Sequence, residues 1–278
     1  MAGPFARRNT AYVAMACYFI TLPFLALVLT GNIRVNDVLN DFYFFKLDVS
    51  HIIPVAVTNS NLLNSVARSL GLHDFYTVGL WNFCEGYLDE GVTFCSKPQQ
   101  FFWFNPVEVL VSELLAGARI ALPSQVVTIL NLLRIGQQVM YTFFMAGSVL
   151  NVVLLVATPL VIITRWWTLV VGFVAGLSGI VLTVAAIIAT VISVAAKVAL
   201  TAQDQLNISA EIGVKMFVFM WIAAIFTDVA FLFHAGMACC CRPDRSKRNK
   251  GSDSFEMEDR STGRSLPAFG SRRRRTSQ

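Results

Sequence analysis

The sequence predicts an all-α membrane protein, a bundle of four transmembrane helices with a small β/α subdomain on one side of the membrane. Hydrophobic residues make up 55% of the chain and charged residues 14%, and the mean hydropathy is +0.61. This composition is too apolar for an ordinary soluble domain. Four apolar runs are each long enough to cross a hydrocarbon core of about 30 Å. Two cysteines and a dense group of aromatic residues lie between the first two runs.

The first span is predicted at residues 11–31, after a short cytoplasmic N-terminus at residues 1–10. Arg7 and Arg8 precede the span, and basic residues at this position favour a cytoplasmic start. A cleaved signal peptide has a similar pattern. The run is longer than the apolar core of a usual signal peptide and has no clear cleavage site after it, so we expect a retained helix.

Residues 32–138 are predicted to form an extracellular loop domain, because no run within them is long enough to span a membrane. The segments 41–49 and 75–83 are rich in aromatic and β-branched residues. Such segments are typical of strands with one half-buried face. We therefore expect a few strands in this domain.

The end of the loop domain is predicted to be helical. Asn105 and Pro106 are typical of a helix N-cap and a first-turn proline. Apolar residues follow at helical spacing, which indicates an amphipathic helix that ends near Pro123. Ser124 can cap a second helix, which we expect to continue directly into the next span.

Three more spans follow the loop domain. They are predicted at residues 139–163, 167–196 and 214–238. The cytoplasmic turn at 164–166 is so short that the second and third spans must form an antiparallel hairpin. Residues 197–213 are predicted to be a short extracellular loop, and residues 239–278 a polar, disordered cytoplasmic tail.

The charge distribution favours cytoplasmic termini and an anionic-lipid partner. The net charge of the chain is +5, but residues 242–278 alone contain eleven Lys or Arg and five Asp or Glu. A basic tail next to a membrane helix favours binding to the anionic inner leaflet rather than to nucleic acid. The candidate lipid-binding residues are Arg272, Arg273, Arg274 and Arg275. Four crossings from a cytoplasmic start place both termini inside.

Cys84 and Cys95 are predicted to form a disulfide. They lie in the predicted extracellular loop, an oxidising compartment in which two nearby thiols are expected to pair. Closing the segment between them would remove about 2–3 kcal/mol of unfolded-chain entropy. Two unpaired thiols are the alternative. A zinc site is not expected, because His51 and His73 have no ligand-like spacing to the cysteines.

Two sets of residues carry a resemblance to known families. One set resembles the first outer loop of the claudin-like superfamily, which carries a Trp, a Cys and a second Cys in this order. The set consists of Gly79, Leu80, Trp81, Cys84 and Cys95. The segments 42–48, 79–86 and 103–106, the last ending in Asn105 and Pro106, resemble more narrowly the fungal Sur-seven/PalI family. The resemblance covers about residues 12–241.

The resemblance implies a multi-pass plasma-membrane protein of eisosomes, which are furrow-like cortical domains that affect cell-wall organisation and endocytosis. It implies self-association or association with other cortical-patch membrane proteins. The PalI branch of the family instead serves ambient-pH signalling and usually has a much longer cytoplasmic tail. The short tail of this chain favours the eisosomal branch.

The aromatic residues of the loop domain have two interpretations each. Trp81 is expected to be a packing anchor next to the disulfide, because a large ring buries apolar area that a small domain otherwise lacks. An interfacial tryptophan in contact with lipid headgroups is the alternative. Residues 101–104 fit either a domain core or an exposed patch that contacts the membrane or a partner.

Small residues recur on one face of the third span, namely Gly172, Gly176, Gly179 and Thr183. Small residues allow the backbones of two membrane helices to approach closely. We expect this face to pack inside the bundle, and a contact between two copies of the protein is the alternative.

Asp228 is an acidic residue well inside the last span, where a charge is costly and suggests a function. Asn151 lies at a similar depth when residues are counted from the outer ends of the helices. We therefore predict a hydrogen bond between them, with Asp228 protonated or linked through water. A proton or ion path is the alternative, but a single acid without a second buried charge makes a poor path.

Three cysteines, Cys239, Cys240 and Cys241, lie at the cytoplasmic end of the last span beside basic residues. Cysteines at this position are candidates for reversible palmitoylation. Unmodified thiols are the alternative.

No catalytic arrangement is evident in the sequence. The three histidines are scattered, and there is no phosphate-binding loop or nucleophile elbow. We therefore expect no enzymatic activity, cofactor or metal. The favoured function is the structural organisation of a fungal plasma-membrane domain. A sensor subunit for ambient pH and a small transporter or channel are the alternatives.

Overall fold

The computed structural model describes residues 4–50, 73–105, 124–163, 165–201 and 209–240. Every described residue belongs to one compact unit, Met1–Cys241. The predicted amphipathic helix that begins at Pro106 lies outside the described residues, as does most of the predicted tail.

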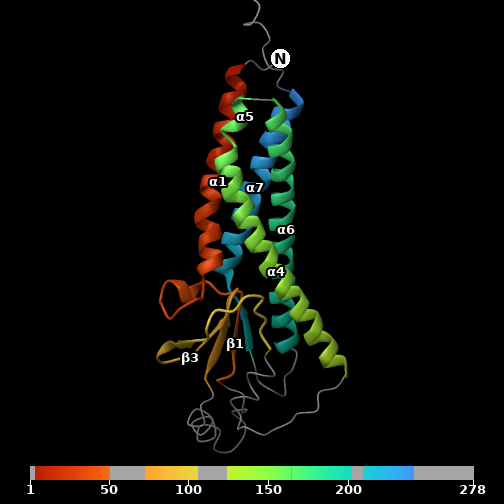
Figure 1. Ribbon diagram of the computed structural model, residues 1–278. Helices are drawn as coiled ribbons and strands as arrows, with labels where there is room; N and C mark the ends of the chain where they lie inside the picture. The colour runs from red at the N-terminus through yellow and green to blue at the C-terminus, as the bar shows by residue number, and fades with distance from the viewer. Residues whose placement is uncertain (1–3, 51–72, 106–123, 164, 202–208, 241–278) are drawn as a thin grey trace, which may run out of the picture. The chain divides into compact units, whose positions relative to one another are not determined.

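Four long helices form the core of the described unit (Figure 1). They are α1 (Pro4–Thr30), α4 (Ser124–Ala157), α6 (Arg165–Thr201) and α7 (Val214–Cys240). Each contains a stretch that is long and apolar enough to cross a membrane. This finding supports the predicted four-span layout. As expected from Ser124, a helix begins at that residue and continues without a break into the second apolar stretch.

The second predicted span, residues 139–163, is not a single helix. The helix α4 ends at Ala157, and a separate short helix α5 (Leu160–Ile163) follows. Pro159 lies between them, and a proline has no N–H to donate and its ring clashes with the preceding helical turn. The prediction of one continuous helix was wrong here because it rested on hydropathy and gave no weight to this proline.

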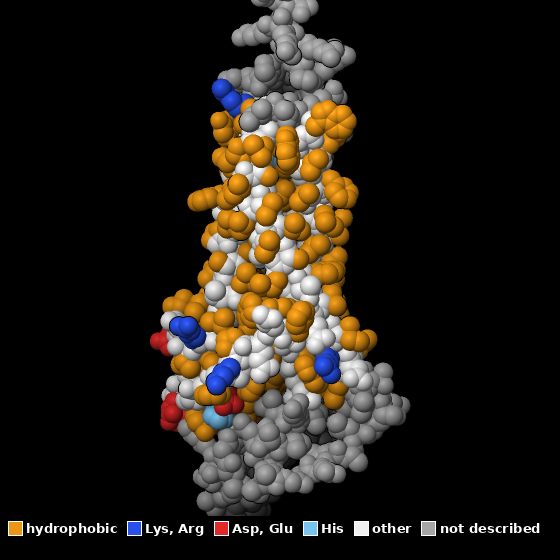
Figure 2. Space-filling view, viewed as in Figure 1, with side chains coloured by type: hydrophobic (Ala, Val, Ile, Leu, Met, Phe, Trp, Pro, Cys, Tyr) orange, Lys and Arg blue, Asp and Glu red, His pale blue; other side chains and the backbone are white. Residues whose placement is uncertain are grey.

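The helices pack as an antiparallel bundle in which α1 contacts α7 and α4, and α6 contacts α4 and α7. One buried apolar cluster lies among α1, α4, α6 and α7 away from the sheet and contains Tyr18, Leu154 and Ala175. A larger cluster joins the helices to the sheet and contains Leu47, Tyr76, Leu80 and Phe144. On the face shown in Figure 2, charged side chains gather at the two ends of the bundle and apolar side chains cover the length between them.

A five-stranded antiparallel sheet lies at one end of the bundle, in the order β4-β3-β2-β1-β5. Its strands are β1 (Phe45–Asp48), β2 (Phe75–Val78), β3 (Phe83–Tyr87), β4 (Gly91–Cys95) and β5 (Ser209–Ile212). The strand predicted within 41–49 is present as β1. The segment 75–83 is not one strand, because β2 ends at Val78 and β3 begins at Phe83. The last strand was not expected, because residues 197–213 were predicted to be a loop.

The strand β5 connects the sheet directly to α7. It pairs with β1, so that Phe45 lies opposite Ile212. The N–H of Gly213 then donates to the carbonyl oxygen of Phe44 at 3.1 Å, one residue before α7 begins. A side chain at Gly213 would overlap the backbone of Tyr43, so only glycine allows this close approach. The sheet is therefore fixed to the bundle by consecutive residues of the chain.

Candidate functional site

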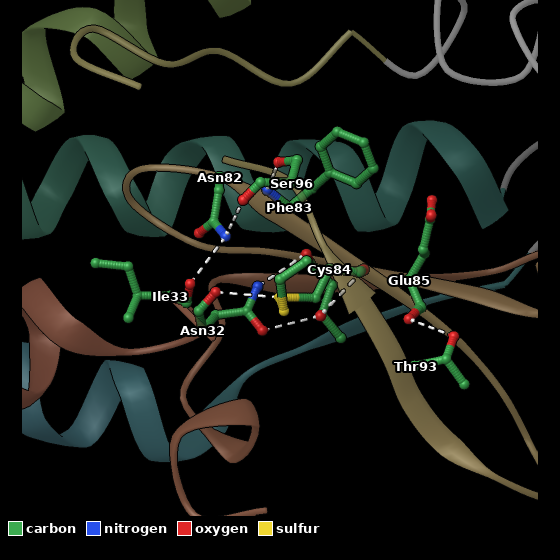
Figure 3. The surroundings of a disulfide bond; sticks show 10 residues. Asn32, Ile33, Asn82, Phe83, Cys84, Glu85, Thr93 and Ser96 are labelled. Atoms are coloured by element: carbon green, nitrogen blue, oxygen red, sulfur yellow. Dashed lines mark hydrogen bonds between the residues drawn. A yellow bond between two sulfur atoms is a disulfide. The ribbon is translucent and has the colours of Figure 1, made fainter. Parts of the chain in front are cut away.

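The disulfide between Cys84 and Cys95 is present and joins the neighbouring strands β3 and β4 (Figure 3). The two residues lie directly opposite each other in the strand register, with their Cα atoms 4.0 Å apart. Cys84 is fully buried. The disulfide therefore closes the outer hairpin of the sheet, as the loop prediction required.

Asn32 connects the end of α1 to the sheet beside this disulfide. Its φ angle is +58°, a left-handed conformation that commonly ends a helix. Its side-chain amide donates to the carbonyl oxygen of Thr77 at 2.9 Å and accepts from the Thr77 hydroxyl at 3.0 Å. Asn32 is fully buried, so both bonds are shielded from water. They fix the end of α1 to strand β2.

Asn82 makes a second connection, between the chain after α1 and the chain after β4. Its amide nitrogen donates to the carbonyl oxygen of Ser96 at 3.0 Å and to that of Ile33 at 3.4 Å. The Ser96 hydroxyl in turn accepts the N–H of Phe83 at 3.2 Å. Figure 3 shows Asn82 between these two segments.

The motif residues Gly79, Leu80 and Trp81 lie where the sheet meets the bundle. An added Cβ at Gly79 would lie 3.1 Å from the Cβ of Asn32, so this position has little room for a side chain. Leu80 is buried in the shared core. The indole N–H of Trp81 donates to the carbonyl oxygen of Leu29 at 2.8 Å.

The Trp81 bond has a specific structural role. Leu29 lies in the last turn of α1, where carbonyl groups have no partner within the helix. The Trp81 ring also packs edge-on against Tyr141 of α4, with 4.9 Å between ring centroids. Trp81 thus contacts two helices at once, which is the packing-anchor arrangement rather than a tryptophan that faces only lipid.

The aromatic segment 101–104 divides between core and surface. Phe104 is buried and its N–H donates to Gln137 of α4 at 2.6 Å. Phe102 packs beside Phe83. Phe101 is 52% exposed. The segment is therefore core at two positions and surface at one, so neither of its two interpretations holds alone.

Charged groups gather where β5 and α7 meet the chain before β1. Lys215 forms an ion pair with Asp41. Burial, followed by the nearby carboxylates of Glu211 and Asp41, raises the pKa of the Tyr43 hydroxyl above its ordinary value. Tyr43 is therefore neutral at physiological pH.

The predicted hydrogen bond between Asn151 and Asp228 is not formed. Asn151 donates to Ser178 of α6 at 3.1 Å and accepts from Thr227 of α7 at 3.1 Å. Asp228 accepts from the Thr183 hydroxyl at 2.9 Å. Residues that follow each other on a helix point about 100° apart, so Thr227 faces α4 while Asp228 faces α6.

The stripe of small residues on α6 packs against α7 of the same chain. A side chain at Gly176 would meet the ring of Phe231, and one at Gly179 would meet the carboxylate of Asp228. Gly172 lies near His234, at 3.9 Å for an added Cβ. Thr183 completes the stripe through its bond to Asp228. This is the intrabundle arrangement rather than the contact between two copies.

The comparison with known protein families covers nearly the same part of the chain as the four helices and the sheet. The model of the SUR7/PalI family matches residues 10–233. This chain belongs to the SUR7/PalI family. It is also 27% identical, over 252 residues, to the SUR7 family protein pun1 of Schizosaccharomyces pombe, with 74% of this chain and 82% of that protein covered. The family predicted from the motif residues is therefore confirmed.

Several predicted residues of this SUR7/PalI family member cannot be placed. Cys239 and Cys240 are the last residues of α7, and their side chains are outside the described part. The described residues also do not include Pro106, Cys241, Arg272, Arg273, Arg274 and Arg275. Their proposed roles stay predictions.

Sequence reasoning missed three residues that hold this SUR7/PalI protein together. Asn32, Asn82 and Gln137 are all buried polar residues that join separate elements. Asn82 lies inside the recognised motif, so its position gave a signal. Asn32 and Gln137 gave none, because each is a single amide at the end or in the polar part of a helical segment.

Proposed function

We propose that this protein is a structural component of the fungal plasma membrane that organises cortical domains of the eisosome type and thereby affects cell-wall organisation and endocytosis. In this proposal the sheet faces the cell wall and both termini are cytoplasmic. Lateral association with other copies or with other cortical-patch proteins assembles the domain. Arg272–Arg275 bind the anionic inner leaflet, and Cys239–Cys241 carry palmitate.

One observation carries the proposal. The sheet is held to the bundle at three separate points, by the Asn32 bonds to Thr77, by the Trp81 bond to Leu29, and by the direct step from β5 to α7. A sheet fixed in this way presents a constant surface at one face of the membrane. A constant surface suits an organising role better than a role that needs a moving lid.

Membership of the SUR7/PalI family supports the same proposal. The buried polar side chains of Ser178 and Thr227 both bond to Asn151, which joins α4 to α6 and α7. These features are typical of a structural bundle.

The test is the distribution of the protein in living fungal cells. A fluorescently tagged full-length chain should appear in cortical patches whose fluorescence recovers slowly after bleaching. The deletion strain should show altered cell-wall integrity with normal growth at alkaline pH. Uniform membrane fluorescence together with defective alkaline growth would reject the proposal and favour the ambient-pH role. An ion or solute flux from purified protein in vesicles would favour a channel instead.

A further inference from the structure

A groove of about 400 Å³ lies beside the disulfide, between two segments far apart in the sequence. Residues 33–35, which follow α1, form one wall. Residues 93–98, which include the end of β4, form the other wall. The proposed organising function does not use this groove.

The two walls are connected to each other at fixed points. Asn82 donates to the carbonyl oxygen of Ile33 in one wall and to that of Ser96 in the other. The disulfide holds Cys95 against β3. The groove is therefore a defined feature of the fold and not a gap between two independent loops.

The groove contains two cations that have no ion-pair partner among the described residues. Arg34 and Lys97 both line it, and the lining contains no acidic side chain. Neither forms an ion pair within the described residues. The other described cations near the sheet have partners. Lys215 pairs with Asp41, Lys46 lies over the ring of Phe75, and Arg134 lies over the ring of Trp103.

The groove lies just after the end of a candidate membrane span. Arg34 comes four residues after Thr30, which ends both α1 and its candidate span. Exposed apolar side chains line the groove beside the cations, since Val35 is 52% exposed and Phe94 is 53% exposed. Exposed apolar residues beside cations at the end of a span are typical of contact with the interfacial region of a bilayer.

We propose that this groove binds the phosphate group of an anionic membrane lipid in the leaflet on the side of the sheet. Arg34 offers a planar donor fork and Lys97 a point charge, and these groups are well suited to a phosphate. In this proposal Val35 and Phe94, which line the groove, contact the glycerol and upper acyl region. A soluble anion would gain nothing from these apolar side chains, which is why we assign the site to a lipid.

The test uses the purified full-length protein and native mass spectrometry, with phosphatidylglycerol as the anionic probe and phosphatidylcholine as the neutral one. We compare the wild type with the groove variant Arg34→Gln/Lys97→Gln. We expect the wild type to retain one phosphatidylglycerol molecule more than this variant. The affinity of that lipid should fall roughly 25-fold in the variant, since each of the two cations near the surface contributes about a factor of five.

The matched control is Lys46→Gln/Lys215→Gln. It also removes two positive charges from this end of the molecule, but from residues outside the groove. It should retain the lipid as the wild type does, and the basic tail is identical in all three proteins. Non-reducing electrophoresis and thermal melting establish that each variant folds with its disulfide.

Three results would overturn the proposal. The first is equal lipid loss in the groove and control variants, which would indicate a general effect of charge. The second is equal retention of phosphatidylglycerol and phosphatidylcholine. This would show that the groove does not select an anionic lipid and would favour another anionic partner, such as an acidic peptide. The third is displacement of the lipid by inorganic phosphate at millimolar concentration, which would identify a site for a free anion.

Discussion

At the scale of single residues, a few buried amides and one indole hold the sheet to the bundle. The side chain of Asn32, just after α1, bonds to Thr77 of β2. The indole of Trp81 bonds to the carbonyl oxygen of Leu29 in the last turn of α1. Carbonyl groups at a helix end need partners from elsewhere in the molecule. Trp81, which lies between β2 and β3, supplies such a partner to Leu29, so the end of α1 and the sheet stabilise each other.

The Trp81 bond gives a direct prediction. Trp81→Phe keeps an aromatic ring against Tyr141 but removes the N–H that donates to Leu29. We expect the free energy of unfolding in detergent to fall by about 1 kcal/mol. The control is Trp103→Phe, which keeps a ring under Arg134. A loss in the control as large as that of Trp81→Phe would contradict the assigned role of the indole N–H.

The comparison between sequence and structure is most instructive at Asn151 and Asp228. Counting residues from the helix ends placed both side chains at a similar depth, and Thr227, the residue next to Asp228, does bond to Asn151. A depth count gives position along the helix axis but not rotation about it. Rotation is decided by packing against the neighbouring helices, and packing could not be derived from the apolar sequence.

At the scale of elements, the contact between α6 and α7 depends on glycine. Gly179 allows the carboxylate of Asp228 to lie against the backbone of α6, where it also accepts from Thr183. Gly236 of α7, by contrast, faces open space. The two glycines therefore form a matched pair for a substitution experiment.

Gly179→Ala should push α6 and α7 apart or displace Asp228 from Thr183. We expect the free energy of unfolding to fall by about 1–3 kcal/mol. Gly236→Ala should be neutral or slightly stabilising, because alanine favours the helical state and meets nothing there. Thermal melting of both purified variants measures the difference. Equal melting temperatures would show that the close approach at Gly179 has no energetic weight.

The outer hairpin of the sheet depends on its disulfide. The bond closes a segment with a sequence separation of 11. The variant Cys84→Ser/Cys95→Ser should lose about 3 kcal/mol of unfolding free energy. Reducing agent should lower the stability of the wild type by a similar amount and leave the variant unchanged. A reductant-sensitive variant would mean that the loss does not come from this bond.

The elements themselves were predictable to different degrees. The apolar runs identified all four long helices, and aromatic and β-branched residues identified β1 and β2. The strand β5 has the sequence Ser-Ala-Glu-Ile, which carries little local preference for a strand. It becomes a strand because β1 offers an open edge, and that pairing joins residues 45–48 to residues 209–212.

At the scale of the whole described unit, the start of α1 and the end of α7 lie together, at the opposite end of the bundle from the sheet (Figure 1). We predict that this end is cytoplasmic, which cysteine labelling in intact cells can test. A membrane-impermeant maleimide should label Val38→Cys beside the sheet, since Val38 is 67% exposed. It should label Arg8→Cys, the matched variant at the other end, only after permeabilisation. The reverse pattern would invert the proposed orientation.

The pairing of β1 with β5 also constrains the order in which the protein can be made. The chain that contains β1 leaves the ribosome before the second, third and fourth helices, whereas β5 follows the third helix. The hairpin of β3 and β4 uses neighbouring residues only, so its two cysteines can pair before the later helices are made. The last edge of the sheet stays open until the third helix has been inserted. The complete sheet can therefore form only after the first three long helices have been made and positioned.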